Sequence, residues 1–256
     1  MIDRDEILIY AKRRGVDPFF IENDYLQHIA LICIYYEFSN ELIFKGGTAL
    51  QKIYGLDRLS LGLDFNLLEG EINQKLVRAV KRMNDYYPSS IADSKKIKHG
   101  IGYKVHIESP SSGVIGMPHI LPLTFNTEEK LAMKPDFRTI NPGMVYKDPD
   151  LRTYSLLVMN IVEIMAEKSR ALVTRKEVKP VDLYDLWFLL NSGFELDTGL
   201  VRKKIEYDHA SFSMERLKAR IDEIKLLWMS DLKPLTKKLL GYEEVLKAVL
   251  SAFHME

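Results

Sequence analysis

The chain has 256 residues, 46% of them hydrophobic, and 36 Lys and Arg balance 36 Asp and Glu, so it carries no formal net charge. This length suits one large domain or two modest ones, and the charge balance excludes a strongly basic nucleic-acid-binding protein, although a local basic surface stays possible. The only cysteine, Cys33, excludes an internal disulfide. No apolar run approaches the ~18 residues of a membrane span, and the N-terminus does not resemble a signal peptide. We therefore expect a soluble, cytoplasmic protein.

The order of predicted elements indicates an α+β fold. Apolar spacing predicts helices over residues 3–14, 21–38, 48–54 and 71–87. Alternating or apolar runs predict strands over residues 42–44, 60–67, 102–108, 119–125 and 132–137, the last interrupted by a proline. Later helices are predicted over residues 155–172 and 182–190 and from 211 onward. We expect a mixed sheet flanked by helices over residues 1–150 and a mainly helical region over residues 151–256.

A pair of glycines stands where a predicted strand passes into a predicted helix. The strand runs into Lys45, Gly46, Gly47 and Thr48. Glycine lets the backbone come close to a ligand, and the amides at a helix N-terminus attract phosphate. The Thr48 hydroxyl could add a donor, and Lys45 and Arg58 could add positive charge. Such a short motif also begins ordinary helices, so it gains weight only in combination with the next strand of the chain.

That next predicted strand, residues 60–67, carries one acid. Ser60, Gly62 and Asp64 would share a face, because alternate residues of a strand point the same way. Two carboxylates on that face would bind Mg²⁺ in a two-metal site. This chain has one of them, and Gly62 stands at the position of the other.

The glycine turn and the strand together resemble the AbiEii/AbiGii toxin family, a branch of the DNA-polymerase-β-like nucleotidyltransferase superfamily. Residues 44–50, FKGGTAL, match the glycine motif of that family. Residues 60–65, SLGLDF, match its Ser-x-Asp-x-Asp strand except at Gly62.

Two later segments extend the likeness. Residues 167–175, EKSRALVTR, resemble the lysine helix of the family, and residues 182–186, DLYDL, resemble its late aspartate helix. The resemblance covers about residues 20–190. It implies a polymerase-β-like core and a helical C-terminal region that contributes to the site.

The resemblance also implies a reaction and the residues for it. The reaction is transfer of a nucleotidyl group from a nucleoside triphosphate (NTP) to an acceptor hydroxyl, with RNA as a plausible acceptor, Mg²⁺ as cofactor and an antitoxin protein as partner. By resemblance, Asp64 and Glu108 bind the metal, and these two residues with Lys168 and Asp182 are catalytic. The implied nucleotide-binding residues are Lys45, Gly46, Gly47, Thr48, Arg58 and Ser60.

The resemblance also implies a third carboxylate, on a neighbouring strand, that helps to activate the attacking hydroxyl, and Glu108 is the candidate for this role. Glu108 ends the predicted strand 102–108 and could be a solvated acid. Asp136 is a weaker candidate for the same role, because it follows Pro135 and could be a turn residue.

The two later motifs leave alternatives as well. Lys168 would neutralise phosphate charge as a point cation, or could be a solvated helix lysine. Ile164 stands one turn before it, so an ion pair within its own helix does not explain Lys168. Asp182 could cap its helix and Asp185 could be structural. Val181 stands where the family usually has an arginine.

Gly62 leaves three explanations open. The chain could be a catalytically inactive descendant that still binds nucleotide or a partner. It could carry an inactivating Asp→Gly change, or another acid such as Asp57 could reach the site. Loss of a metal-binding carboxylate could lower the rate roughly a thousandfold or more, so we expect weak or absent activity.

Two other functions stay open. One is a non-catalytic nucleotide- or protein-binding module on the same fold, and the other is a helical interaction protein in which the glycine motif is incidental. The basic run at residues 95–99, with the basic side chains of residues 75–82, could form a face for an RNA backbone, with Tyr86 and Tyr87 stacking on bases. The six histidines form no close pair at metal-ligand spacing, so we expect no zinc site.

Overall fold

The computed structural model describes residues 1–112 and 116–253. The chain forms two compact units. The first takes in Met1–Gly55, Leu59–Leu131 and Pro135–Val158. The second takes in Leu56–Arg58, Ala132–Lys134 and the chain from Met159 onward. Among the described residues, no helix is long and apolar enough to cross a membrane.

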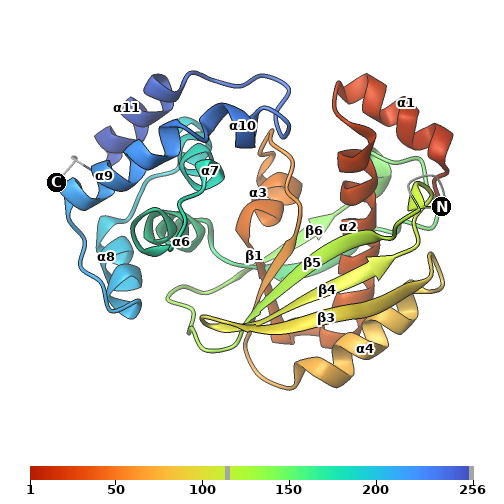
Figure 1. Ribbon diagram of the computed structural model, residues 1–256. Helices are drawn as coiled ribbons and strands as arrows, with labels where there is room; N and C mark the ends of the chain where they lie inside the picture. The colour runs from red at the N-terminus through yellow and green to blue at the C-terminus, as the bar shows by residue number, and fades with distance from the viewer. Residues whose placement is uncertain (113–115, 254–256) are drawn as a thin grey trace. The chain divides into compact units, whose positions relative to one another are not determined.

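The first unit is built on a seven-stranded mixed sheet in the order β3-β4-β5-β2-β1-β7-β6 (Figure 1). The strands are β1 (Leu42–Lys45), β2 (Leu63–Leu67), β3 (Ser89–Ile97), β4 (Gly100–Ile107), β5 (His119–Asn126), β6 (Asp136–Ile140) and β7 (Tyr154–Val158). β1 pairs antiparallel with β2, whereas β2 pairs parallel with β5 and β1 pairs parallel with β7. The predicted α+β class is confirmed.

The described residues of this unit form the helices α1 (Arg4–Arg14), α2 (Pro18–Phe38), α3 (Gly46–Tyr54) and α4 (Ile72–Met83). α2 packs on α4, and these helices contact β5 and β3 on one face of the sheet (Figure 1). The alternating residues Tyr103, Val105 and Ile107 of β4 are buried under them. Lys104 of β4 and Ile120 of β5 point to the opposite, exposed face.

The strand predictions need correction at four places, one of which is the strand predicted over residues 132–137: in the structure this strand is β6, Asp136–Ile140. β2 begins at Leu63 and not at residue 60, so Ser60 and Gly62 lie before the strand. β7 occupies the start of the helix predicted over residues 155–172, because its apolar residues complete the sheet beside β1. β3 was not predicted, because this edge strand is rich in charged and polar residues and is mostly exposed.

The second unit is helical. It contains α6 (Ile161–Thr174), α7 (Pro180–Asn191), α8 (Thr198–Tyr207), α9 (Met214–Lys225), α10 (Trp228–Leu232) and α11 (Tyr242–Ala252). Side-chain caps begin three of the helices, from Asn160, Asp197 and Ser213. Trp228 packs against Tyr184 and Tyr242 in the core of this unit.

Candidate nucleotide site

The diglycine turn joins β1 to α3 in the first unit. Lys45 has an extended backbone and is buried, and Gly46 follows with a φ of 76°, in the left-handed region. That backbone favours glycine, because a Cβ would be strained there. The first amides of a helix have no acceptor within the helix, and the helix dipole is positive at this end. The start of α3 at Gly46, Gly47 and Thr48 is therefore suited to an anion.

Asp64 lies directly against this turn. The antiparallel register pairs Lys45 with Asp64. A Cβ added to Gly46 would lie 2.5 Å from Asp64 Oδ2 and 3.2 Å from Asp64 Cγ. The structure thus places the predicted carboxylate against the predicted glycine turn.

The hydroxyls of Thr48 and Ser60 are used within the protein. Thr48 is fully buried, and its Oγ1 lies 2.8 Å from Ser60 Oγ and is hydrogen bonded to the carbonyl oxygen of Gly62. These contacts hold residues 60–62 against the start of α3. In this structure Thr48 and Ser60 shape the turn through their side chains.

A buried polar face of α2 holds the same segment from the other side. Asn23 Nδ2 and Gln27 Nε2 donate to the carbonyl of Ser60 over 3.1 and 2.8 Å. The amide of Ser60 donates to Gln51 Oε1 on α3 over 2.9 Å, and Gln51 Nε2 donates to Asp24 over 2.8 Å. Our sequence analysis missed these residues. A signal for them was available in the sequence. The otherwise apolar helix has polar side chains at helical spacing, at positions 23, 24, 27 and 28, which indicates one polar face.

Asp24 is ionised in this buried setting. Burial opposes its charge, but Lys52 Nζ at 2.8 Å and the Tyr146 hydroxyl at 2.6 Å hold the pKa of Asp24 well below its usual range. His28 lies close by, and its Nδ1 is 2.9 Å from the Tyr154 hydroxyl. Burial lowers the pKa of His28 to about 3, so this imidazole is neutral at physiological pH.

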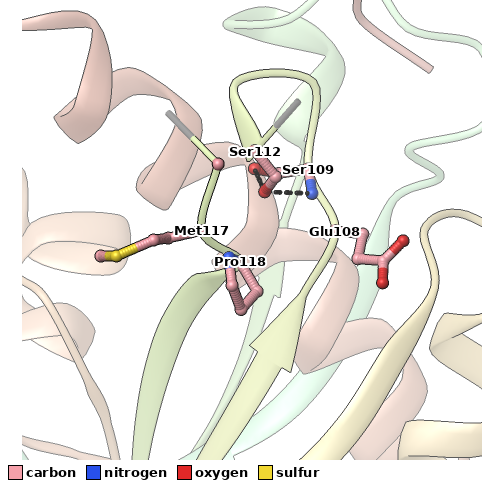
Figure 2. Close-up of a pocket in the computed structure, with 6 residues that line it drawn as sticks. Glu108, Ser109, Ser112, Met117 and Pro118 are labelled. Carbon is pink, nitrogen blue, oxygen red and sulfur yellow. Dashed lines mark hydrogen bonds between the residues drawn. The ribbon is translucent and has the colours of Figure 1, made fainter. Parts of the chain in front are cut away.

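Glu108 does not lie beside Asp64. The register places Thr124 of β5 beside Asp64, and Gly102 of β4 opposite Thr124. Glu108 is six residues further along the chain from Gly102, about 20 Å away at the usual rise of a strand. It is exposed and lines a pocket of about 390 Å³ with Ser109, Ser112, Gly116, Met117 and Pro118 (Figure 2).

Asp136 is also distant from the turn. It begins β6, and β7 and β1 separate that edge strand from β2. Within residues 1–112 and 116–253, no group of three or more His, Cys, Asp or Glu side chains is placed to hold a metal ion. At the diglycine turn the acidic ligand available to a cation is therefore Asp64.

The later motifs meet in an ionic cluster inside the second unit. Arg58 Nε and Nη2 donate to the two carboxylate oxygens of Asp185, both over 2.6 Å. Lys168 Nζ lies 2.8 Å from Asp182 Oδ1 and 2.7 Å from Asp185 Oδ2. Arg175 pairs with Asp182. Three cations thus surround two carboxylates.

Burial and pairing set the charges of this cluster. Burial disfavours ionisation of Asp185, yet Arg58 and Lys168 hold its pKa below the ordinary value. Burial also disfavours the ammonium of Lys168, and Asp182 and Asp185 still hold its pKa above the ordinary value. Both residues are therefore charged at neutral pH.

The cluster corrects two sequence interpretations. Lys168 is not a solvated lysine, because α7 supplies its carboxylate partners. Asp182 does not cap α7, because Lys179 is at the cap position and Asp182 bonds to Lys168. Arg58, placed with the nucleotide by resemblance, is 3% exposed and bonded to Asp185 in this unit. Asp57 accepts a hydrogen bond from the Tyr184 hydroxyl over 2.8 Å.

The predicted basic face is largely neutralised on α4. Arg78 and Arg82 pair with Glu37, and Lys75 pairs with Glu41. Tyr87 is partly buried, and its hydroxyl donates to the carbonyl of Ile2 over 2.9 Å. These side chains fasten α4 to its neighbours, and the RNA-binding face stays a prediction.

A strand that passes through a diglycine turn into a helix, beside a strand whose carboxylate meets that turn, defines a nucleotidyltransferase-class core. The family model described as nucleotidyl transferase AbiEii toxin, type IV TA system, matches residues 33–252. The chain belongs to this family of nucleotidyltransferase toxins of toxin–antitoxin systems. No curated protein matches the chain.

Two solved structures share the fold. MenT4, a nucleotidyltransferase toxin from Mycobacterium tuberculosis H37Rv, matches with a TM-score of 0.69 at 17% identity. The match covers 99% of this chain and 89% of the MenT4 chain. JHP933 from Helicobacter pylori has a TM-score of 0.58 at 19% identity, covering 91% of each chain. At these identities the likeness is one of fold.

Proposed function

We propose that this chain binds an NTP at the turn of Gly46 and Gly47 and transfers a nucleotidyl group to an acceptor hydroxyl. The observation that carries the proposal is the contact between Gly46 and Asp64, where an added Cβ would lie 2.5 Å from a carboxylate oxygen. The amides at the start of α3 attract phosphate, whereas Asp64 repels it. A divalent cation between the carboxylate and the phosphates removes this repulsion.

The residues at the turn fit one Mg²⁺ bound together with a nucleotide. Asp64 would supply the acidic ligand, and Mg²⁺ commonly takes its other ligands from substrate phosphates and water. When bound, Mg²⁺ would neutralise charge on the triphosphate. Gly46 and Gly47 would bind the phosphates through their backbone amides.

We assign Lys168 and Asp182 a charge-positioning role within the second unit. Asp182 and Asp185 hold Lys168 in place. Arg175, with 40% of its side chain exposed, is the open part of this cluster.

The family resemblance favours an RNA hydroxyl as acceptor. Membership of a toxin–antitoxin family supports an antitoxin protein as partner. We propose that the chain acts in the cytoplasm, where NTPs and RNA are available to it.

A second candidate is a non-catalytic module that binds nucleotide without transferring it. Gly62 favours this function, because a two-metal site needs a carboxylate at that position. The two candidates share NTP binding and differ in group transfer.

Labelling with α-³²P-NTPs and total RNA separates them. We expect the wild-type chain with Mg²⁺ to bind an NTP and to label RNA slowly, and Asp64→Asn to lose at least about tenfold in NTP affinity, since one charged contact is worth about 1.5–3 kcal/mol. Asp93→Asn is the matched control, because Asp93 is a largely exposed carboxylate of the same sheet. Binding without labelling would favour the module, and the absence of both would contradict the proposal.

A further inference from the structure

Position 62 is one of two positions, with Val181, at which the chain departs from its family resemblance, and at position 62 the structure shows a packing reason. β2 begins at Leu63, which pairs with Leu123 of β5. Gly62 meets Pro122, the residue before Leu123, so the pairing of the two strands stops where these two residues stand. A proline has no N–H to give to a ladder, which agrees with an end to the pairing at this point.

Glycine is favoured at position 62 by its neighbour and not by the backbone. Its φ lies outside the left-handed region, so other residues could adopt this conformation. A Cβ at Gly62 would lie 3.0 Å from the carbonyl oxygen of Pro122 and 3.2 Å from its Cγ. The proline ring is closed onto its own backbone, and β5 lies between β4 and β2, so neither atom can readily move aside.

The same contact limits the carboxylates that the sheet offers. The positions of β5 beside residues 62 and 64 are Pro122 and Thr124, and neither is an acid. Within β1, β2 and β5, all of which the structure describes, Asp64 is the only acidic residue.

We propose that Gly62 and Pro122 form a matched packing pair that keeps this site at one carboxylate, so that a divalent cation binds at Asp64 only together with the phosphates of a nucleotide. The cation part rests on the proposed function, whereas the packing pair rests on the contact alone. A single carboxylate leaves most of the Mg²⁺ shell to water, and phosphate oxygens replace several of those waters. Gly62 is then a residue that fits the packing of the sheet and not a damaged aspartate.

Thermal melting tests the packing pair without reference to activity. We expect Gly62→Ala to lower Tm by about 3–8 °C, because overpacking destabilises a close-packed site. The matched control is Gly102→Ala, since a Cβ there would meet its nearest neighbour at an ordinary 3.6 Å. Pro122→Ala in the Gly62→Ala background should restore part of the lost Tm, because it removes the ring Cγ at 3.2 Å and leaves the carbonyl oxygen at 3.0 Å in place. Equal Tm values for Gly62→Ala and Gly102→Ala would overturn the proposed packing pair. So would a Tm of Gly62→Ala that does not rise when Pro122→Ala is added.

Mn²⁺ binding, followed by the electron paramagnetic resonance of the free ion, tests the cation part. We expect the wild-type chain to take up Mn²⁺ only when a non-hydrolysable NTP analogue is present, and Asp64→Asn to lose this uptake. Gly62→Asp combined with Pro122→Ala should bind Mn²⁺ without nucleotide. Stoichiometric Mn²⁺ binding by the nucleotide-free wild type would overturn the inference. Failure of the analogue to bind with any cation would remove the proposed function and the cation part together, whereas the melting series would still decide the packing pair.

Discussion

The charged side chains of the two units have different partners. At the diglycine turn of the first unit, a half-buried carboxylate, Asp64, lies against the backbone of Gly46. In the second unit, Arg58 and Lys168 are buried against Asp182 and Asp185 within 2.6–2.8 Å. The first arrangement is suited to a ligand that brings its own charges, and the second keeps its charges together.

This difference separates residues that would bind a ligand from residues that stabilise the fold. Removing one partner of a buried, hydrogen-bonded ion pair leaves an uncompensated charge and strongly destabilises a protein. Removing a carboxylate whose partner is a bound cation should lower mainly the affinity for the ligand and change the stability of the protein little. Stability and nucleotide affinity should therefore respond to different residues in the two regions.

The largest expected effect is that of Asp185→Asn. It leaves Arg58 buried without its carboxylate and should lower the free energy of unfolding by about 3–5 kcal/mol. Urea unfolding followed by tryptophan fluorescence is a direct measurement, because both tryptophans of the chain, Trp187 and Trp228, lie in the second unit.

Asp64→Asn is the matched change in the first region. We expect it to alter stability by less than about 1 kcal/mol while weakening NTP binding, since Asp64 is only half buried. If Asp64→Asn destabilised the chain as much as Asp185→Asn, the distinction between the two regions would fail.

The same distinction explains what could be predicted from sequence. The glycine turn and Asp64 belong to local patterns close together in the chain, and the prediction that they form one site agrees with their contact in the first unit. The partners of Lys168 could not be read from its own helix, because Asp182 and Asp185 come from the next helix. Long-range pairing of charges leaves no periodic signal along the chain.

Strand ends were harder to predict than strands. The alternating pattern predicted that the strand with Asp64 begins at Ser60, whereas β2 begins at Leu63. The pairing ends where Pro122, far along the chain, faces Gly62. β7 was read as helix because its five residues continue into α6 with only two residues between them. The distance of Glu108 from Asp64 depends on the register between three strands, which one sequence does not reveal.

Gly46→Ala is the next largest perturbation, and it acts on the first region. The new Cβ would meet Asp64 Oδ2 at 2.5 Å with φ held at 76°, so we expect a loss of about 2–4 kcal/mol in stability and of NTP binding. Gly55→Ala is the control, because its φ of 74° carries the same strain while nothing lies within 4 Å. Circular dichroism during urea unfolding gives both values. Equal losses in the two variants would show that the contact with Asp64 has no energetic weight.

The smallest effect is a dependence on pH that should distinguish the two regions. Burial lowers the pKa of His28 to about 3 and that of His119 to about 4 in the folded first unit. In the unfolded chain both take up a proton near pH 6.5. Between these values the unfolded state binds more protons, so stability should fall as pH drops below 6.5, by up to about 1.4 kcal/mol per pH unit for each histidine.

The second unit should respond outside that range. The pKa of Asp185 is lowered, so its contribution is lost only as pH falls below the ordinary aspartate range, near 3.9. The pKa of Lys168 is raised, so its contribution is lost only as pH rises above about 10.5.

Urea unfolding at pH 7, 6 and 5 measures the contribution of His28, which is surrounded by Asp24, Lys52 and Arg14. We expect His28→Gln to reduce the slope of stability against pH by about half, because the slope from His119 remains. An unchanged slope in His28→Gln would mean that protonation of this histidine does not lower the stability of the first unit. The contrast between the two regions would then rest on the ion pairs alone.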